Sequence, residues 1–274
     1  MRALRRRAVV TSLLFSLALL LPSAASAASY PSSMAATGDS ITRAFNTSWF
    51  PYVDNPSASW STGTSTSVNS HYTRLLKLNP AIKSHNLNDA KSGARMVNLA
   101  GQMQTAVGQN VQYVTALMGG NDLCTSTMDT MTSVDTFRLQ FTAAMNTVTA
   151  GLPAANVYVV SIPNVYHLWE LFKDNSSARN TWAAFKVCQS LLANPLSTAT
   201  ADVARREAVR QRNIAFNTVL SEVCVAYAQC HFDGNAVFNT VFAASDVSTR
   251  DYFHPTISGQ AKLASVTWTA GYWP

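Results

Sequence analysis

The chain has 274 residues, of which 47% are hydrophobic and 12% are charged, and its formal net charge is +6. The charged share is about half of the ~25% that is usual in globular domains, which excludes a disordered chain held open by its charge. Eleven Gly and ten Pro are too few for a collagen-like or low-complexity protein. The positive charge by itself suggests a nucleic-acid or membrane-surface partner, so the position of the charges matters.

The first segment of the chain, residues 1–28, has the three parts of a secretory signal peptide. Four arginines lie between residues 2 and 7, residues 8–21 are mostly apolar, and small residues follow as far as an Ala-x-Ala site at Ala25 and Ala27. The apolar run is too short for an ordinary membrane span, although an uncleaved N-terminal anchor is the alternative. We expect cleavage after Ala27 and secretion, by the general or the twin-arginine route. Loss of the four arginines lowers the net charge from +6 to +2, so we expect no nucleic-acid partner.

Residues 28–274 predict one domain in which short strands alternate with helices. In chain order the pattern predicts a strand at 34–37, a long surface loop at 46–70, a helix at 71–78, a strand at 82–87, a helix at 96–107, a strand at 113–118, a helix at 133–152, a strand at 157–162, a helix at 202–228, a weak strand at 231–232 and a helix at 258–272. This alternation indicates βαβ units and a parallel sheet covered on both faces. Residues 163–201 exceed what a crossover needs, and we expect them to pack over the end of the sheet where ligands bind in open α/β folds. No segment after the leader is apolar enough to span a bilayer.

The four cysteines are an even number in a chain expected to be exported, which favours disulfides over free thiols. Four cysteines allow three pairings. We favour Cys124–Cys188 with Cys224–Cys230, because the second pair is close enough in sequence to staple one turn. The chain has no Cys-x-x-Cys and no paired Cys/His spacing, so we expect no zinc site.

A candidate nucleophile follows the first strand, in Gly38-Asp39-Ser40-Ile41. A small residue lets the chain turn sharply at the end of the strand. The serine can then present its hydroxyl at the start of a helix, where amides and the helix dipole favour a developing anion. The alternative is that Ser40 or Asp39 only caps the helix.

A candidate base lies near the C-terminus, in Asp251-Tyr252-Phe253-His254-Pro255. A hydroxyl nucleophile needs a base within hydrogen-bond reach, and the base needs a group that fixes its tautomer. An aspartate three residues before a histidine can fold back onto the imidazole, and Pro255 disfavours a helix at His254. The alternative is a capping aspartate and a surface histidine.

Two further segments contain candidate donors to a developing oxyanion. Gly119-Gly120-Asn121-Asp122 follows an apolar run, and an asparagine side chain donates two hydrogen bonds. Ser92-Gly93-Ala94 follows the second strand, where a free glycine amide could donate. Each segment alone could also be a loop made of turn-forming residues, but all four motifs together could gather at one edge of a parallel sheet.

In these residues the chain resembles the SGNH, or GDSL, hydrolase family. The motif sequences look most like those of the secreted lipase and phospholipase-like branch. GDSI at Ser40 is similar to the nucleophile block, Gly93 to the second block, GGND at Asn121 to the third, and DYFH at Asp251 and His254 to the fifth. The resemblance extends over residues 34–268. Ile41 replaces the leucine of the family name, an apolar swap that conserves volume.

The resemblance implies a three-layer α/β/α sandwich with about five parallel strands in a flavodoxin-like order, and ester hydrolysis through an acyl-enzyme. Ser40 would attack the carbonyl carbon, His254 would act as base and then acid, and Asp251 would hold the imidazole. The amides of Ser40 and Gly93 and the side chain of Asn121 would form the oxyanion hole. No metal and no cofactor are implied, and Asp39 would be structural, bonding the turn that carries Ser40.

Three sets of residues outside these motifs have more than one interpretation. Four other histidines lack a nearby acid and serine, so we expect them to be surface or packed residues: His71, His85, His167 and His231. Four aromatic residues could line an acyl pocket or pack in the core and loops: Trp49, Trp60, Tyr166 and Trp169. Four arginines on the long late helix are expected to form a solvated face, with a lipid-headgroup patch as the alternative: Arg205, Arg206, Arg210 and Arg212.

The sequence therefore predicts a secreted, monomeric serine esterase that acts on carboxylic esters, preferably of lipids or phospholipids. A carbohydrate acetyl esterase is the alternative among enzymes. A secreted binding protein that keeps the fold without catalysis is the alternative outside them, and the intact set of Ser, Gly, Asn, Asp and His argues against it.

Overall fold

The computed structural model describes residues 30–273, so the predicted leader and its cleavage site lie outside the described residues. Five strands form one sheet in the order β2-β1-β3-β4-β5, and every neighbouring pair is parallel. The strands are β1 (Met34–Gly38), β2 (Asn86–Asn88), β3 (Tyr113–Leu117), β4 (Asn156–Val159) and β5 (Cys230–Phe232). This is the flavodoxin-like order, so the predicted α/β class and strand order are confirmed.

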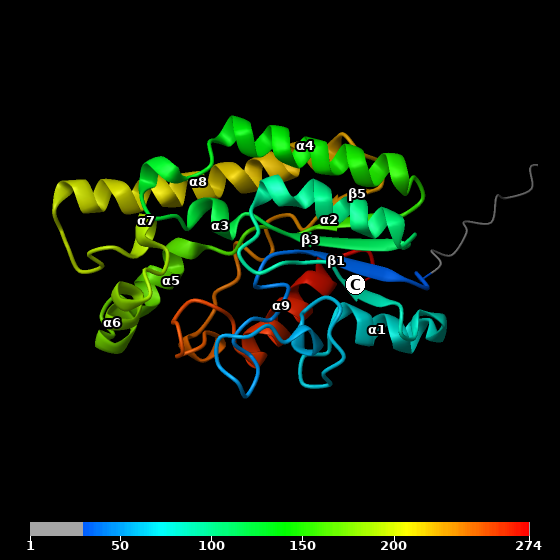
Figure 1. Ribbon diagram of the computed structural model, residues 1–274, viewed down its shortest axis with the longest axis horizontal. Coiled ribbons are helices and arrows are strands. Elements are labelled where there is room, and N and C mark those ends of the chain that lie inside the picture. The colour runs from blue at the N-terminus through cyan, green and yellow to red at the C-terminus, as the bar shows by residue number, and fades with distance from the viewer. Residues whose placement is uncertain (1–29, 274) are drawn as a thin grey trace, which may run out of the picture.

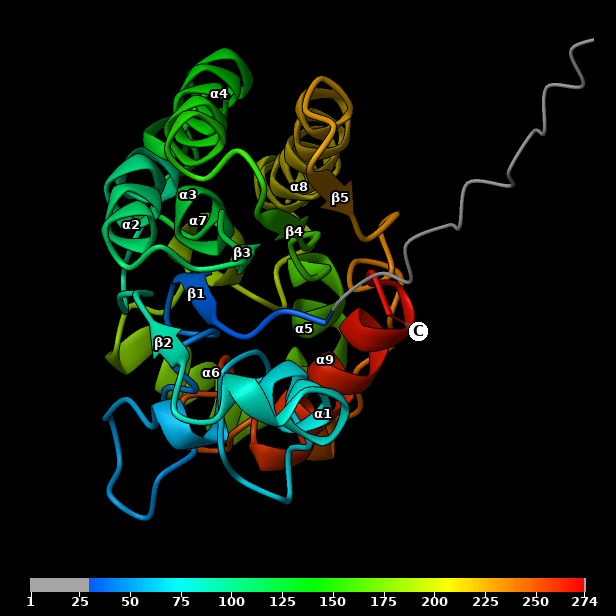
Figure 2. The same ribbon diagram turned by 90° about the vertical axis from the view of Figure 1, so that its right-hand side faces the viewer.

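Helices cover both faces of the sheet and complete a three-layer sandwich (Figures 1 and 2). One face carries α2 (Met96–Gly108), α4 (Val134–Gly151) and α8 (Thr200–Val225), and the other carries α1 (His71–Leu78) and α9 (Ile257–Thr269). Strand β3 is buried on both sides: Val114 and Ala116 belong to the core under α2, α4 and α8, whereas Tyr113 and Leu117 belong to the core under α1 and α9. Side chains alternate across a strand, so one apolar strand supplies both cores.

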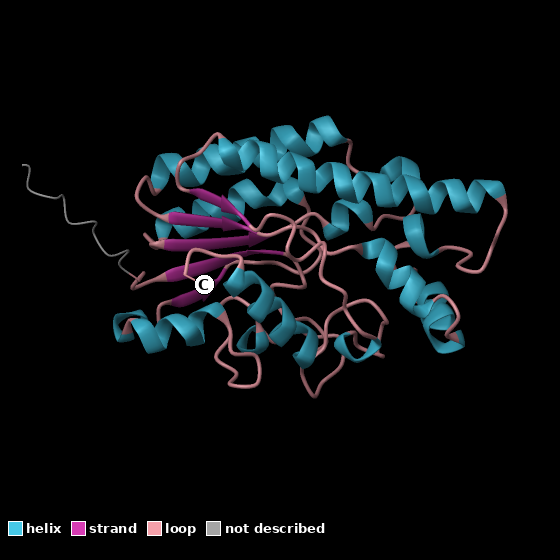
Figure 3. Cartoon of the chain, turned by 180° about the vertical axis from the view of Figure 1, so that it is seen from behind, coloured by secondary structure: helices cyan, strands magenta, loops and turns pink. Residues whose placement is uncertain are grey.

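The segment between β4 and α8 forms three short helices beyond the carboxyl ends of the strands (Figure 3). These are α5 (Val165–Phe172), α6 (Ser176–Ala184) and α7 (Gln189–Leu192). Its placement over the ligand-binding end of the sheet is confirmed. A fourth short helix, α3 (Gly120–Leu123), follows β3 at the same end.

Two strands differ from their predicted bounds by more than one residue at an end. The predicted strand 82–87 is reduced to Asn86–Asn88, because Pro80 begins a 3-10 turn through Ile82 and Ser84 has a φ of 65°. The predicted strand 157–162 ends at Val159, and the backbone amide and carbonyl of Ile162 bond instead to the side chain of Asn217 on α8.

Both favoured disulfides, Cys124–Cys188 and Cys224–Cys230, are present. The first joins the end of α3 to the start of α7, and so ties the loop of Asn121 to the segment above it. The second joins α8 to β5. The sequence separations of 64 and 6 residues correspond to about 4 and about 2 kcal/mol in the loop-entropy account of disulfide stabilisation.

The predicted solvated arginine face on α8 is wrong for Arg205 and Arg206. Arg206 is 4% exposed, lies 4.7 Å from the Trp169 ring centre, and donates to the carbonyl oxygen of Ser197 at 2.6 Å. Arg205 donates to the carbonyl oxygen of Ser190 at 2.7 Å. These guanidinium groups satisfy backbone carbonyls of the segment before α8, which the helical pattern of the arginines does not reveal.

Candidate active site

Ser40 lies at the carboxyl end of β1, where Gly38 makes the turn possible. Gly38 has a φ of 143°, and a Cβ added there would collide with the carbonyl oxygen of Leu117 on the neighbouring strand. The side-chain amide of Gln102 is buried. Its Oε1 accepts a hydrogen bond from the Gly38 N–H at 2.7 Å, and its Nε2 donates to the Gly38 carbonyl oxygen at 2.9 Å. Only glycine allows both this φ and this close approach, so the strand end is fixed and Ser40 is presented at the edge of the sheet.

Ser40, His254 and Asp251 form a continuous hydrogen-bonded series. The Oγ of Ser40 lies 2.8 Å from Nε2 of His254, and Nδ1 of His254 lies 2.7 Å from Oδ2 of Asp251. The other carboxylate oxygen, Oδ1, accepts the backbone amides of Phe253 and His254 at 3.0 Å each. The carboxylate thus closes its own turn and orients the imidazole, which is the arrangement of a serine nucleophile with an oriented base.

The carboxyl group of Asp251 remains ionised. Burial alone would raise its pKa, but the hydrogen bond from His254, the charge of that imidazole when it is protonated, and the amides of His254 and Phe253 outweigh burial and hold the pKa below its usual range. An ionised carboxylate favours the tautomer in which Nδ1 carries a proton and Nε2 faces Ser40.

Asn46 is part of this series, and the sequence motifs do not indicate it. Its side-chain amide donates to Oδ2 of Asp251, the oxygen that faces His254, and its own Oδ1 accepts the amide of Tyr52 at 2.7 Å. Asn46 is 4% exposed and has a φ of 66°. Six residues separate it from Ser40 but 205 separate it from Asp251, so only the fold reveals the contact.

Of the predicted oxyanion donors, the structure places Asn121 in the same cavity wall as Ser40. One N–H of the Asn121 side chain donates to the carbonyl oxygen of Ala94 at 2.9 Å, which leaves its second N–H for another acceptor. Gly93 is the residue before Ala94 and has a φ of 80°. The second and third predicted blocks are therefore joined by a direct hydrogen bond.

Asp39 is buried beside Ser40 and supports the turn that carries it. Its Oδ1 accepts the amide of Ile41 at 2.9 Å, which agrees with the predicted structural role. Burial raises the pKa of Asp39 to about 6, although the Ile41 hydrogen bond opposes the shift. Burial also raises the pKa of Asp122, which accepts the Met96 amide at 2.8 Å and so fixes the start of α2 to the loop of Asn121.

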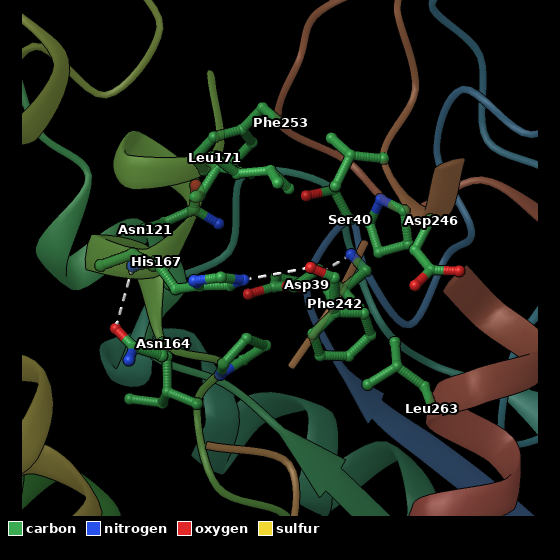
Figure 4. Close-up of a pocket in the computed structure, with 18 residues that line it drawn as sticks. Asp39, Ser40, Asn121, Asn164, His167, Leu171, Phe242, Asp246, Phe253 and Leu263 are labelled. Carbon is green, nitrogen blue, oxygen red and sulfur yellow. Dashed lines mark hydrogen bonds between the residues drawn. The ribbon is translucent and has the colours of Figure 1, made fainter. Parts of the chain in front are cut away.

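An apolar cavity opens beside Ser40 and Asn121 (Figure 4). Most of its wall comes from the loop after β4, from α5 and from residues 233–256 between β5 and α9, which we call the C-terminal loop. The apolar side chains are Ile41, Ile162, Pro163, Val165, Leu168, Leu171, Phe242, Val247, Phe253, Pro255 and Leu263, and the polar ones are Asp39, Asn164, His167 and Asp246. The cavity therefore has the Ser40 hydroxyl at one edge and a mainly hydrocarbon lining, which suits an acyl chain.

The predicted aromatic candidates do not line this cavity. Trp60 is fully buried in the core under α1 and α9. Tyr166 and Trp169 are half-buried. The guanidinium group of Arg210 lies over the Tyr166 ring, and that of Arg206 lies over the Trp169 ring. Trp49 is 84% exposed. The packing interpretation is correct for three of the four, and the pocket is instead lined by aliphatic residues and by Phe242 and Phe253.

Among the other histidines, His71 is buried, His231 is half-buried and His85 is exposed, as surface or packed residues should be. His167 differs, because it lines the cavity and its Nε2 donates to the carbonyl oxygen of Phe242 at 3.1 Å. Within residues 30–273 no group of three or more His, Cys, Asp or Glu side chains is arranged to hold a metal ion. The same part of the chain contains no helix long and apolar enough to cross a membrane.

A three-layer α/β sandwich with serine, histidine and aspartate in one hydrogen-bonded series at the carboxyl edge of its sheet defines the class of serine hydrolases. The GDSL-like lipase/acylhydrolase family model matches residues 34–266. The chain belongs to this family and is an ester hydrolase.

Solved structures share this fold at low sequence identity. LAE5, an α/β hydrolase from the metagenome of Lake Arreo, is 14% identical with a TM-score of 0.54, over 87% of this chain and 94% of its own. The lipase Lip_vut3 from a goat rumen metagenome is 15% identical with a TM-score of 0.54, over 88% and 98%. A family 3 carbohydrate esterase from Clostridium thermocellum is 13% identical with a TM-score of 0.52, over 86% and 93%. None of the curated proteins compared with the chain matches it.

Proposed function

We propose that this protein is an exported esterase that hydrolyses lipid-like acyl esters through an acyl-enzyme on Ser40. The observation that carries the proposal is the hydrogen-bonded series Ser40–His254–Asp251, whose first member, Ser40, lines an apolar cavity. A nucleophile with an oriented base supplies the chemistry, and the hydrocarbon lining supplies the preference for an acyl chain.

In the proposed mechanism Nε2 of His254 takes the proton from Ser40 as Oγ attacks the ester carbonyl. Asp251 stabilises the imidazolium that forms, and the amides of Ser40 and Gly93 with the free N–H of Asn121 stabilise the negative oxygen. His254 then gives its proton to the leaving alcohol. Water enters, loses a proton to His254 and releases the acid, and the proton returns to Ser40.

The acyl chain would occupy the cavity between α5 and the C-terminal loop, with its carbonyl carbon at Ser40. The side chains of Leu168, Leu171 and Phe253 contribute to this wall. Burying the chain against them releases about 25 cal/mol for each Å² of apolar surface. An acetyl group would leave most of this lining unused, which is why we favour longer acyl esters over acetylated carbohydrates.

The same proposal includes the organisation of the chain. We propose removal of residues 1–27 during export and a single domain from residue 28 to 274 that acts as a monomer. The two disulfides support an oxidising compartment, where such bonds form and persist.

The test is a panel of nitrophenyl esters with acyl chains of two to sixteen carbons, phospholipids and acetyl xylan, run on wild type and Ser40→Ala. Ser40→Ala should lower kcat/KM by at least about a thousandfold. Ser265→Ala, an exposed serine on α9, serves as the matched control and should retain activity. Peak activity on acetyl xylan with none above short chains would overturn the lipid preference, and full activity in Ser40→Ala would overturn the mechanism.

A further inference from the structure

Five consecutive residues beside the active site, Trp49, Phe50, Pro51, Tyr52 and Val53, are all exposed and carry no charge. We call residues 49–53 the aromatic loop. Trp49 is 84% exposed and Phe50 63%. Scattered apolar residues are ordinary on a protein surface, but a contiguous apolar patch marks an interaction site.

The aromatic loop is held in place rather than left to collapse onto the protein. The guanidinium group of Arg250 donates to the carbonyl oxygens of Ser48 at 2.7 Å, Trp49 at 3.0 Å and Phe50 at 3.2 Å. The hydroxyl of Tyr52 returns a bond to the Arg250 carbonyl at 3.4 Å. The half-buried guanidinium group of Arg250 therefore fixes the backbone of the loop while the apolar side chains face water.

The loop adjoins the catalytic groups of the proposed function. Asn46, just before the loop, donates to Asp251, and the ring of Phe45 lies 4.8 Å from that of His254. On its other side the ring of Tyr52 lies 5.7 Å from Phe185, which is 61% exposed at the end of α6. The exposed apolar surface thus extends from the loop to the end of α6.

We propose that the aromatic loop docks the protein on the surface of lipid aggregates, with Trp49 and Phe50 inserted at the level of the headgroups of zwitterionic phospholipids. Tryptophan and tyrosine favour this boundary because one end of each ring is apolar and the other polar. Docking through this loop brings Ser40 and the cavity mouth to the surface that holds the substrate. The inference rests on the proposed lipid-ester function and adds the surface through which it reaches its substrate.

The ring geometry disfavours a polysaccharide as the occupant. Sugars stack on flat, coplanar aromatic faces, but the rings of Trp49 and Phe50 meet at 81° and those of Tyr52 and Phe185 at 43°. The carbonyl oxygens of Trp49 and Phe50 already accept hydrogen bonds from Arg250, so they are not free for sugar hydroxyls. The loop exposes apolar side chains whose rings point in different directions, and a fluid lipid surface can accommodate such an arrangement.

The experiment measures binding to sucrose-loaded phosphatidylcholine vesicles in the Ser40→Ala background, so that the lipid is not consumed. The pair Trp49→Ser with Phe50→Ser should weaken partitioning at least about tenfold, since both substitutions remove apolar surface that the lipid would bury. The matched control pair is Leu139→Ser with Val225→Ser, which are 72% and 85% exposed on α4 and α8. This control should bind vesicles like its parent.

Three further measurements test the inference: ester hydrolysis, the salt dependence of vesicle binding, and binding to xylan. With Ser40 restored, the loop pair should hydrolyse a soluble butyrate ester within about twofold of wild type but lose activity on vesicles, because the loop lies outside the cavity wall. Equal vesicle binding by the loop pair, or binding abolished by 0.5 M salt, which screens charges, would overturn the inference. Binding to insoluble xylan that depends on Trp49 and Phe50 would also overturn it. Failure of the proposed function is a different result, since it is read from Ser40→Ala on soluble esters.

Discussion

Asn46 connects the exposed aromatic loop to Asp251, because its side-chain amide donates to the same carboxylate oxygen that faces His254. Its φ of 66° suits glycine, so Asn46→Gly removes the donor without straining the backbone. A hydrogen bond to a charged group contributes about 1.5–3 kcal/mol, and we therefore expect kcat to fall about 10- to 100-fold. KM for a soluble ester should change little, which steady-state kinetics will show.

The control for Asn46 is Asn110→Gly, an exposed residue with a φ of 53° in the turn before β3. It makes the same chemical change at the opposite end of the sheet and should leave kcat unaltered. If Asn46→Gly lowered only the unfolding temperature and not kcat, Asn46 would support the loop without orienting Asp251.

Asn121 is expected to act on the transition state rather than on substrate binding. One of its amide hydrogens is engaged by the Ala94 carbonyl, so the side chain is already oriented before substrate arrives. Loss of one oxyanion donor typically lowers kcat by about 10²–10³, and we expect this for Asn121→Ala with KM nearly constant. A rise in KM at constant kcat would instead identify Asn121 as a ground-state binding group.

At the scale of elements, α8 holds α5 and the chain after α7 through Arg206. Its guanidinium donates to the Ser197 carbonyl and covers the Trp169 ring. Arg206→Met fills much of the same space but leaves the carbonyl without its donor. The free energy of unfolding should fall by about 1–3 kcal/mol, measured by denaturant titration. Arg210→Met, an exposed arginine 5.4 Å from the Tyr166 ring centre, should change it by less than about 0.5 kcal/mol, and equal losses would contradict the role of Arg206.

The elements that the sequence predicts well are those in which apolar residues recur at the regular spacing of a helix or a strand. Helix α1 has its predicted bounds, His71–Leu78, and α4 begins after Ser133, which caps it by accepting the Thr136 amide at 3.1 Å. Strand β2 is an edge strand of three residues, Asn-Leu-Asn, none of them buried. An edge strand with polar, half-exposed side chains lacks the apolar run by which strands are recognised. The sequence pattern therefore predicts this strand at 82–87, several residues too early.

The candidate site divides in the same way. Ser40, Asp251 and His254 lie in short motifs at strand ends or turns, so their roles can be predicted from the residues next to them in the sequence. The cavity wall and Asn46 depend instead on packing between distant segments, such as α5 against the C-terminal loop. No local spacing encodes such contacts.

At the scale of the whole molecule, the core under α1 and α9 is built around a neutral histidine. His71 is 1% exposed, with Nδ1 2.9 Å from the Tyr113 hydroxyl and Nε2 2.8 Å from Oγ1 of Thr267. Thr267 donates its own hydrogen to the Leu263 carbonyl, so Nε2 of His71 carries the proton and Nδ1 accepts from Tyr113. Burial, assisted by the charge of Arg74, lowers the pKa of His71 to about 3.

This lowered pKa makes stability depend on pH with a definite sign. The unfolded chain binds a proton at His71 near the ordinary pKa of 6.5, whereas the folded chain binds it only near 3. The unfolded state therefore holds more protons between these values, and the free energy of unfolding falls as the pH decreases through this window. Asp39 acts in the opposite direction, because its folded pKa of about 6 lies above the ordinary 3.8. Its contribution is present below 3.8 and is lost as the pH rises through 6.

His71→Gln separates the two effects, because glutamine can accept from Tyr113 and donate to Thr267 but does not titrate. Asp39 is common to both proteins, so its contribution cancels in their difference. The stability advantage of wild type over His71→Gln should shrink by roughly 1 kcal/mol for each pH unit between pH 6 and pH 4, and should be constant above pH 7. Urea unfolding of both proteins at matched pH and ionic strength measures this difference. An advantage that stays level across the range would mean that His71 is protonated in the folded core, with Tyr113 and Thr267 both accepting from it.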